Sequence, residues 1–200
     1  MSLFKRLLNP KTYKPSKKDG LSKYVPEKKL PLDEKFTQNF NQNGGKFLYC
    51  ITPQEILEAF DNILLENDWY EQEVFCIDSN LAKRFDGFNL DFNTNIAGKF
   101  FLTSCESLVA NDGAILFSSN QIKEKKMNEL PSNIIVFATT SQFTENISEG
   151  MRIIQNKAAG NIPTNITTIK DFKTESEKEK DFMSYGSSTK NLYLLLLEDL

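Results

Sequence analysis

The sequence KFLYCITPQEILEAFDNILL, residues 46–65, contains a predicted β-strand followed at once by a well-defined helix. Lys46–Ile51 is an apolar run typical of a buried strand. Thr52 is the expected N-cap, Pro53 suits the first helical position, and Glu55 can close a capping box. The helix that follows has apolar residues at helical spacing, which predicts one face packed on a sheet: Ile56, Leu57, Phe60, Ile63 and Leu64.

The alternation of strands and helices continues on both sides of this stretch. Further helices are predicted at 32–41 and 80–85, and Ser141 is the expected N-cap of another, with Phe143, Ile147, Met151 and Ile154 on its apolar side. Further strands are predicted at 73–77, 99–102, 114–118, 133–138 and 192–197, the last nearly all Leu and therefore inside the sheet. This order indicates an α/β protein with helices packed over a mostly parallel central sheet.

Composition excludes several classes of function. The 200 residues fit a single domain, and a net charge of −3 with a pI near 5.2 argues against a nucleic-acid partner. Histidine is absent, so any acid–base chemistry falls to carboxylates, lysines or tyrosines. Cys50, Cys76 and Cys105 are too far apart for a cluster or zinc site and read as buried, reduced thiols. We therefore expect a cytoplasmic protein with no metal and no cofactor.

The N-terminal segment differs from the rest of the chain. Residues 1–30 are basic and contain prolines, which predicts a flexible arm ahead of a domain at 31–200. An alternative is a short amphipathic anchor at Ser2–Leu8 for a partner or an anionic membrane. The pattern predicts neither a signal peptide nor a transmembrane segment. A second charged stretch, residues 170–182, reads as a solvated excursion from the domain.

The main cluster of candidate functional residues lies between residues 101 and 119, where apolar strands run out into hydroxyl and carboxyl side chains. Ligands of open α/β sheets collect at the carboxyl ends of strands, so this region predicts a ligand site. The alternative is an ordinary hairpin turning at Asn111-Asp112-Gly113. Glu106 is the candidate general base, with a structural hydrogen-bonding role as its alternative. The predicted ligand-binding residues are Thr103, Ser104, Asn111, Asp112, Gly113, Ser118 and Ser119, together with a hydroxyl-rich turn at Gly186, Ser187, Ser188 and Thr189.

This region resembles the LUD domain, the lactate-utilisation LutC (YkgG-like) family. Thr103 and Glu106 match the family's Thr-Gly-Ala-Glu stretch, and Ala110 and Gly113 match its Ala-Glu-Thr-Gly turn. The family strand that ends in Ser is matched at Ser118-Ser119. The resemblance extends from about residue 47 to residue 200, through the Leu-Pro motif at 130–136 and the closing strand at 190–199.

The resemblance implies a fold, partners and a function. The implied fold is a three-layer α/β/α arrangement with a mostly parallel central sheet, as in ribose-phosphate isomerase and CoA transferases (NagB/RpiA/CoA transferase-like). The implied function is that of the cluster-free subunit, or an accessory protein, of L-lactate oxidation to pyruvate beside iron–sulphur LutA/LutB-like proteins. The alternatives are a stand-alone binder or enzyme for an anionic metabolite, such as a CoA thioester or sugar phosphate, and a non-catalytic scaffold.

The chain also departs from the family pattern. Asn111 and Asp112 replace the family's Glu-Thr, and Asn133 replaces its His. Residues 161–170 lack the Arg and the two acids of a family motif, and residues 186–189 lack another His. Ligand contacts are expected at these positions. The departures therefore predict either a different ligand or a non-catalytic role.

Overall fold

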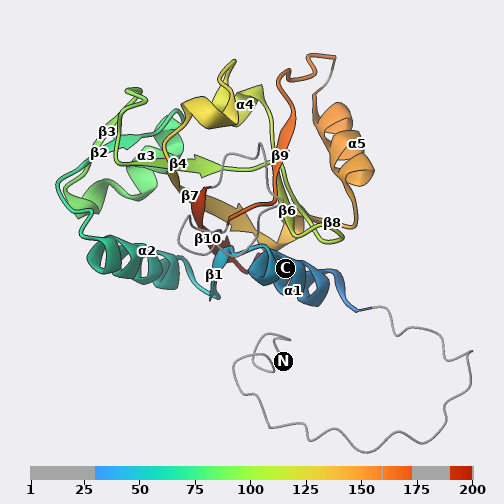
Figure 1. Ribbon diagram of the computed structural model, residues 1–200, viewed down its shortest axis with the longest axis horizontal. Coiled ribbons are helices and arrows are strands. Elements are labelled where there is room, and N and C mark those ends of the chain that lie inside the picture. The colour runs from blue at the N-terminus through green and yellow to red at the C-terminus, as the bar shows by residue number, and fades with distance from the viewer. Residues whose placement is uncertain (1–29, 159, 173–189, 200) are drawn as a thin grey trace, which may run out of the picture.

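A computed structural model describes residues 30–158, 160–172 and 190–199 (Figure 1). Its central sheet has six strands in the order β1-β10-β7-β4-β2-β3, and every neighbouring pair is parallel. The strands are β1 (Lys46–Cys50), β2 (Glu73–Phe75), β3 (Asp91–Asn93), β4 (Phe100–Ser104), β7 (Asn133–Thr139) and β10 (Asn191–Leu197). The predicted parallel sheet is therefore confirmed.

Strand β10 shows how the sheet divides the core. It lies between β1 and β7, with Leu194 paired to Phe47 on one side and to Val136 on the other. Leu192, Leu194 and Leu196 pack into one apolar cluster, whereas Tyr193 and Leu195 pack into a second cluster. This alternation follows from the two-residue period of a strand. The nearly all-Leu run is buried on both faces, as predicted.

One face of the sheet, here called the helical face, is covered by α2 (Pro53–Asn67), α3 (Ser79–Arg84) and the short η2 (Asp86–Phe88). The start of α2 confirms the predicted cap, because Glu55 N donates to Thr52 Oγ1 at 3.2 Å. Glu55 Oε2 accepts from the N–H of Ile51, one residue before the N-cap, at 2.7 Å. Ile56, Ala59, Phe60, Ile63 and Leu64 are the buried residues of this helix.

The opposite face, here called the mixed face, is covered by a helix and a second, smaller sheet. The helix α1 (Leu32–Gln42) buries Phe36 and Phe40. The small sheet has the order β8-β5-β6-β9, and its β5 and β6 form an antiparallel hairpin. Helix α5 lies over the outer side of that sheet at the right of Figure 1. The elements are β5 (Ser107–Val109), β6 (Ala114–Phe117), β8 (Phe143–Thr144), β9 (Thr167–Ile169), α4 (Ser119–Ile122) and α5 (Ile147–Lys157).

These layers confirm the predicted three-layer α/β/α fold, with a small sheet sharing one outer layer with helices. The predicted hairpin at residues 101–119 is present, but its first strand is β5. β4 instead belongs to the central sheet, where Thr103 pairs with Val136. The strands β3, β5 and β9 are not predicted, because a run of three residues carries too little periodicity to detect unless, like β2, it lies within a longer apolar run.

The predicted N-cap at Ser141 is wrong. Ser141 lies in a short 3-10 turn, η4 (Thr140–Gln142), and its N–H donates to Asp199 Oδ1 at 2.8 Å. The cap of α5 is Asn146, whose Oδ1 accepts from Glu149 N at 3.0 Å. Phe143, predicted on the apolar side of that helix, pairs with Leu108 in the small sheet. Pairing with a distant strand overrode the local helical pattern.

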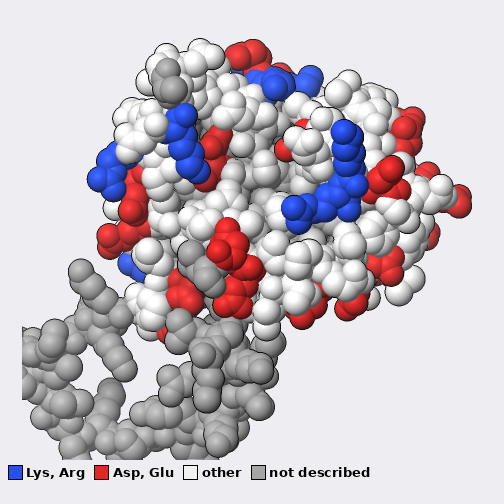
Figure 2. All heavy atoms as spheres, turned by 180° about the vertical axis from the view of Figure 1, so that it is seen from behind, with Lys and Arg blue, Asp and Glu red and all other residues white. Residues whose placement is uncertain are grey.

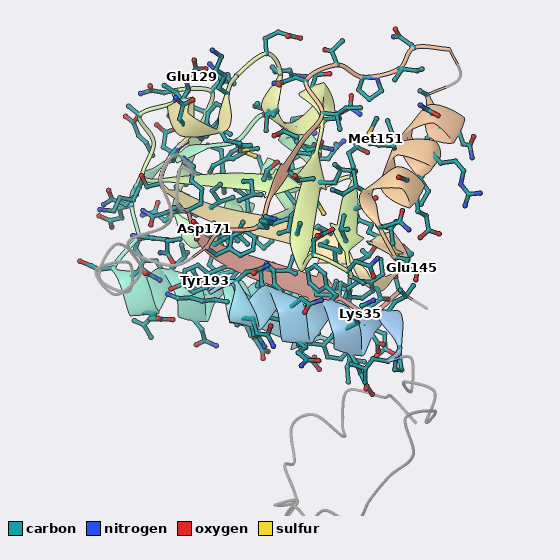
Figure 3. All side chains as sticks on the ribbon, turned by 45° about the vertical axis from the view of Figure 1, so that its right-hand side comes forward. Lys35, Glu129, Glu145, Met151, Asp171 and Tyr193 are labelled. Atoms are coloured by element: carbon teal, nitrogen blue, oxygen red, sulfur yellow. The ribbon has the colours of Figure 1, made fainter. Side chains whose placement is uncertain are left out.

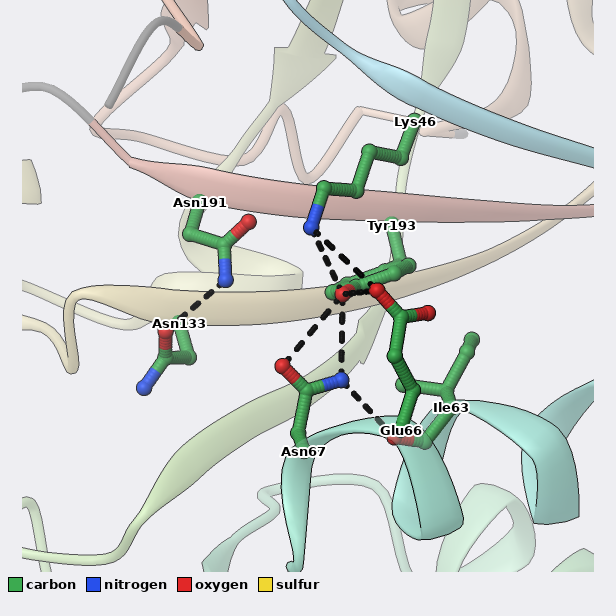
Figure 4. A network of polar contacts seen from close by, with 7 residues as sticks. All are labelled: Lys46, Ile63, Glu66, Asn67, Asn133, Asn191 and Tyr193. Carbon is green, nitrogen blue, oxygen red and sulfur yellow. Dashed lines mark hydrogen bonds and ion pairs between the residues drawn. The ribbon is translucent and has the colours of Figure 1, made fainter. Parts of the chain in front are cut away.

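A polar network closes the amino edge of the central sheet (Figure 4). Tyr193 Oη accepts hydrogen bonds from Lys46 Nζ at 2.7 Å and from Asn67 Nδ2 at 3.0 Å. The hydroxyl also lies 3.3 Å from Glu66 Oε1, to which it can donate. Tyr193 is 2% exposed, so these contacts satisfy a hydroxyl that would otherwise be buried without a partner. The network joins α2 to the starts of β1 and β10.

All three cysteines are buried and unpaired, as predicted. Burial raises the pKa of Cys50 and of Cys76 to about 11 and raises that of Cys105 further, so none of the three is a ready nucleophile. The N-terminal arm at 1–29, residues 173–182 of the charged excursion and the turn at 186–189 lie outside the described residues. Among the helices that are described, none has the length and apolar character needed to cross a membrane.

Candidate functional site

A polar cleft opens at the carboxyl ends of β2 and β4. The chain leaves β2 through α3 on the helical face, whereas it leaves β4 through the β5–β6 hairpin and α4 on the mixed face. The two connections therefore diverge between neighbouring parallel strands, which is where open α/β sheets bind ligands. The cleft encloses about 270 Å³ and is lined by Ile77, Asp78, Ser79, Thr103, Ser104, Asn120, Gln121 and Lys123.

The polar groups of the cleft form two sets, those that are hydrogen-bonded within the protein and those that are not. Asp78 caps α3, since its Oδ1 accepts from the N–H groups of Asn80 and Leu81 at 2.9 and 3.3 Å. Thr103 Oγ1 donates to the Ser104 carbonyl at 3.0 Å. Among the described residues, the hydroxyls of Ser79 and Ser104 and the ammonium of Lys123 have no hydrogen-bond or ion-pair partner. These three groups are free to bind a ligand.

Glu106 holds the wall of the cleft that α4 forms. Its Oε1 accepts from Ser118 Oγ at 2.6 Å, from Asn120 Nδ2 at 2.9 Å and from Gln121 Nε2 at 3.1 Å. Ser118 is fully buried, and its N–H donates to Gln121 Oε1 in a capping box at the start of α4. A single carboxylate oxygen thus fixes the two side chains, Asn120 and Gln121, that face the cleft.

Glu106 itself is not among the residues that line the cleft. A general base must come within hydrogen-bond reach of the proton that it removes. The geometry therefore supports the structural alternative for Glu106 more than the catalytic one. The structure brings five of the predicted site residues to this end of the sheet, although only the first two line the cleft: Thr103, Ser104, Glu106, Ser118 and Ser119.

The predicted site residues Asn111, Asp112 and Gly113 lie at the other end of the same hairpin. Lys35 of α1 donates to Asn111 Oδ1 at 2.5 Å, and Asn111 N donates to the Glu145 carbonyl at 3.0 Å. Figure 3 shows Lys35 and Glu145 at this end of the small sheet. The structure therefore separates the turn from the cleft. The predicted hydroxyl-rich turn lies outside the described residues: Gly186, Ser187, Ser188 and Thr189.

Of the eight residues that line the cleft, sequence reasoning identified only Thr103 and Ser104. Asp78 and Ser79 follow β2, and Asn120, Gln121 and Lys123 belong to or follow α4. Two local signals were available: an Asp before a short helical pattern, and the Ser118-x-x-Gln121 spacing of a capping box. Neither signal says that these helix starts face each other across two strands. That fact depends on the strand order.

A second polar cluster lies at the carboxyl end of β7. Asp199 accepts hydrogen bonds from Thr140 Oγ1, Ser141 N and Ser141 Oγ at 2.7 to 2.8 Å. Burial works against the ionised carboxylate, but these bonds outweigh it and lower the pKa of Asp199 to about 2. The donors are satisfied within the chain. Among the described residues, no group of three or more cysteine or carboxylate side chains is placed to hold a metal ion.

The structure is that of a three-layer α/β protein with a small polar cleft at the carboxyl end of its central sheet, between two strands whose connections diverge. The chain belongs to the LUD domain family, whose sequence model matches residues 93–197, just over half of its length. A solved structure supports the same fold: the crystal structure of a DUF162 family protein from Deinococcus radiodurans at 1.70 Å resolution. The two are 10% identical with a TM-score of 0.57, over 84% of this chain and 96% of that chain. No curated protein matches this sequence.

Proposed function

We propose that this LUD domain protein binds a small carboxylate, L-lactate or pyruvate, as the cluster-free subunit or an accessory protein of L-lactate oxidation. The observation that carries the proposal is the cleft between β2 and β4, where the hydroxyls of Ser79 and Ser104 and the ammonium of Lys123 are free. Hydroxyl donors and one cation are the groups that recognise a carboxylate. The family membership supplies the link to lactate.

The size of the cleft favours a small ligand. Its volume of about 270 Å³ is just below the range that is usual for small-molecule sites, about 300–1,000 Å³. L-lactate, pyruvate and a triose phosphate are small enough for a cleft of this volume. A CoA thioester could place only its acyl end here. For the alternative of a stand-alone binder of anionic metabolites, the volume of the cleft favours small organic acids and small phosphates.

The residues of the cleft suggest binding and orientation rather than electron transfer. Oxidation of a hydroxy acid removes two electrons, which a partner must accept, and the chain carries none of the closely spaced cysteines that ligate a cluster. Iron–sulphur LutA/LutB-like proteins are the proposed partners. Deleting the gene should abolish or slow growth on L-lactate, and normal growth of the deletion strain would contradict this role.

Binding can be tested by thermal unfolding with L-lactate, pyruvate, a triose phosphate and inorganic phosphate in turn. A ligand present at 100 times its dissociation constant should add about 2.7 kcal/mol to the free energy of unfolding. Ser104→Ala/Lys123→Ala should remove that stabilisation, because it deletes two of the three free groups. Ser148→Ala/Lys157→Ala on α5 is the matched control and should keep it. Equal stabilisation of the two variants would place the ligand elsewhere.

A further inference from the structure

A second and larger hollow lies on the outer side of the helical face. This groove runs between α2 and the chain at 87–89 and encloses about 500 Å³. It is separate from the cleft, with which it shares no lining residue. Its lining residues are Gln54, Leu57, Glu58, Asp61, Tyr70, Gly87, Phe88 and Asn89.

The groove combines apolar surface with negative charge. Leu57 and Phe88 are half-buried and form its apolar part, and Glu58 and Asp61 are exposed along α2. Tyr70 Oη donates to Asp61 Oδ1 at 2.9 Å and so fixes the position of that carboxylate. No lysine or arginine lines the groove. Figure 2 shows the molecule from behind, with acidic side chains along its lower right. Helix α2 lies on this side, because it is at the lower left of Figure 1.

The charge of the chain is divided unevenly between the N-terminal segment and the rest. Residues 1–29 carry nine Lys and Arg against two Asp and Glu, a net charge of +7. The whole chain carries 24 and 27, so residues 30–200 carry 15 and 25, a net charge of −10. Opposite charges of this size on one chain attract each other, and the attraction is strongest at low ionic strength.

We propose that the segment Ser2–Leu8 docks in this groove of its own chain. The sequence of the segment has two features that the groove could match. Its adjacent cations, Lys5 and Arg6, could pair with Glu58 and Asp61, and its apolar side chains could pack on Leu57 and Phe88. The segment can reach the groove, because residues 9–29, which connect it to the described structure, can span about 70 Å when extended. A domain of this size is roughly 40 Å across.

Docking can be followed by energy transfer in the full-length chain. Ser2→Cys provides one labelling position for an acceptor, and Trp69, the single tryptophan, is the donor next to Tyr70 of the groove. The three native cysteines are buried, so the label goes to position 2. We expect strong transfer at low salt. It should decrease from 0.1 M to 1 M salt, as the screening length falls from about 10 Å to about 3 Å.

Charge reversal tests the groove itself. Glu58→Lys/Asp61→Lys should lower the ratio of docked to undocked segments about tenfold, because repulsion replaces two ion pairs. Both positions are exposed, so the fold should be retained. Asp112→Lys/Glu145→Lys makes the same change in net charge at the turn of the β5–β6 hairpin and should keep the transfer.

The segment is tested by the reciprocal change. Lys5→Glu/Arg6→Glu should lose transfer in the native groove and regain it when combined with Glu58→Lys/Asp61→Lys. Weak transfer at low salt in the labelled native chain would overturn the proposal. Equal transfer in the groove variant and its control, or no recovery in the combined variant, would do the same, since the occupant would then be another molecule or another part of the chain.

Discussion

The two ends of the β5–β6 hairpin carry similar polar residues, but these residues have different hydrogen-bond partners. The turn end carries Asn111 and Asp112, and the open end carries Glu106 and Ser118. At the turn, Asn39 of α1 and Asn43, the C-cap of that helix, donate to backbone carbonyls of residues 110–113 at 2.8 to 3.3 Å. At the open end, the network around Glu106 supports a cleft whose nearby hydroxyls are free.

The comparison shows what separates a structural polar cluster from a ligand site. The polar groups at the turn form hydrogen bonds within the protein and hold α1 against the small sheet. Few of their donors and acceptors therefore remain available to a ligand. At the open end the internal bonds position side chains, and other groups close by remain unpaired. A ligand site needs both conditions, namely a fixed wall and free donors.

The largest effect is expected from Gly113→Ala at the turn. Gly113 has a φ of +57°, and an added Cβ would lie 2.4 Å from the backbone of Asn39 and Phe40. We expect a loss of about 3 kcal/mol in the free energy of unfolding, measured by urea denaturation, because α1 must move away.

Two glycines separate the causes of that loss. Gly160 has a φ of +93°, and no atom lies within 4 Å of an added Cβ. Gly160→Ala should therefore lower the free energy of unfolding by about 1 kcal/mol through backbone strain alone. Gly87→Ala has neither feature and should be close to neutral. A Gly113→Ala variant no less stable than Gly160→Ala would mean that the turn is not tightly packed on α1.

At the open end, Glu106→Ala should cost about 2 kcal/mol, because it removes the acceptor of three side-chain donors, one of them the buried Ser118 hydroxyl. Glu106→Gln keeps an acceptor oxygen and should cost less than about 1 kcal/mol. Urea denaturation of both variants measures this difference.

Glu106→Gln also separates the two roles of this residue. If it binds ligand as the native protein does and complements a deletion strain fully, the general-base assignment should be dropped. If it folds and binds but does not complement, the carboxylate itself is needed and the catalytic assignment gains support.

A smaller effect is expected from Asn43→Ala at the turn. Its Nδ2 donates to the Asp112 carbonyl at 2.8 Å and to the Gly113 carbonyl at 3.3 Å. We expect a loss of about 1 kcal/mol in thermal unfolding and no change in ligand binding, because the turn is not part of the cleft. Asn128→Ala, an exposed position in the short η3 (Met127–Glu129), is the control and should be neutral. Weaker ligand binding in Asn43→Ala would show that the two ends are coupled.

The smallest effect on stability is expected in the cleft itself. Ser104→Ala/Lys123→Ala should change the free energy of unfolding by less than about 0.5 kcal/mol without ligand, because both groups are unpaired within the described structure. Its effect should appear only when ligand is added. Destabilisation in the absence of ligand would show that these groups have a structural role after all.

Much of the fold was predictable from local sequence. The Thr52-Pro53 start of α2, the apolar face that follows it and the Leu-rich β10 all have the predicted structure. These elements are long and strongly periodic, so their own residues define them. The predicted Ser141 cap is wrong because Phe143 pairs with a strand far along the chain. The three-residue strands β3, β5 and β9 are too short to detect, whereas β2 lies within the longer apolar run 74–77.

The candidate site was predictable only in part. Thr103, Ser104 and Ser118 were assigned correctly to strand ends, where polar residues follow apolar runs. Asp78, Ser79 and Lys123 were not found, since each is an ordinary polar residue beside a short helix. Asn111 and Asp112 were grouped with the site because they are close in sequence, yet the hairpin carries them to its other end.

The sequence by itself determined the class of fold, the burial of the cysteines and the places where polar residues follow strands. These depend on periodicity, capping and composition, which are local properties of the chain. Only the tertiary structure decided that β2 and β4 are neighbours and that the connections after them leave on opposite faces. Strand order is set by packing between segments distant in sequence, and the cleft exists only because of that order.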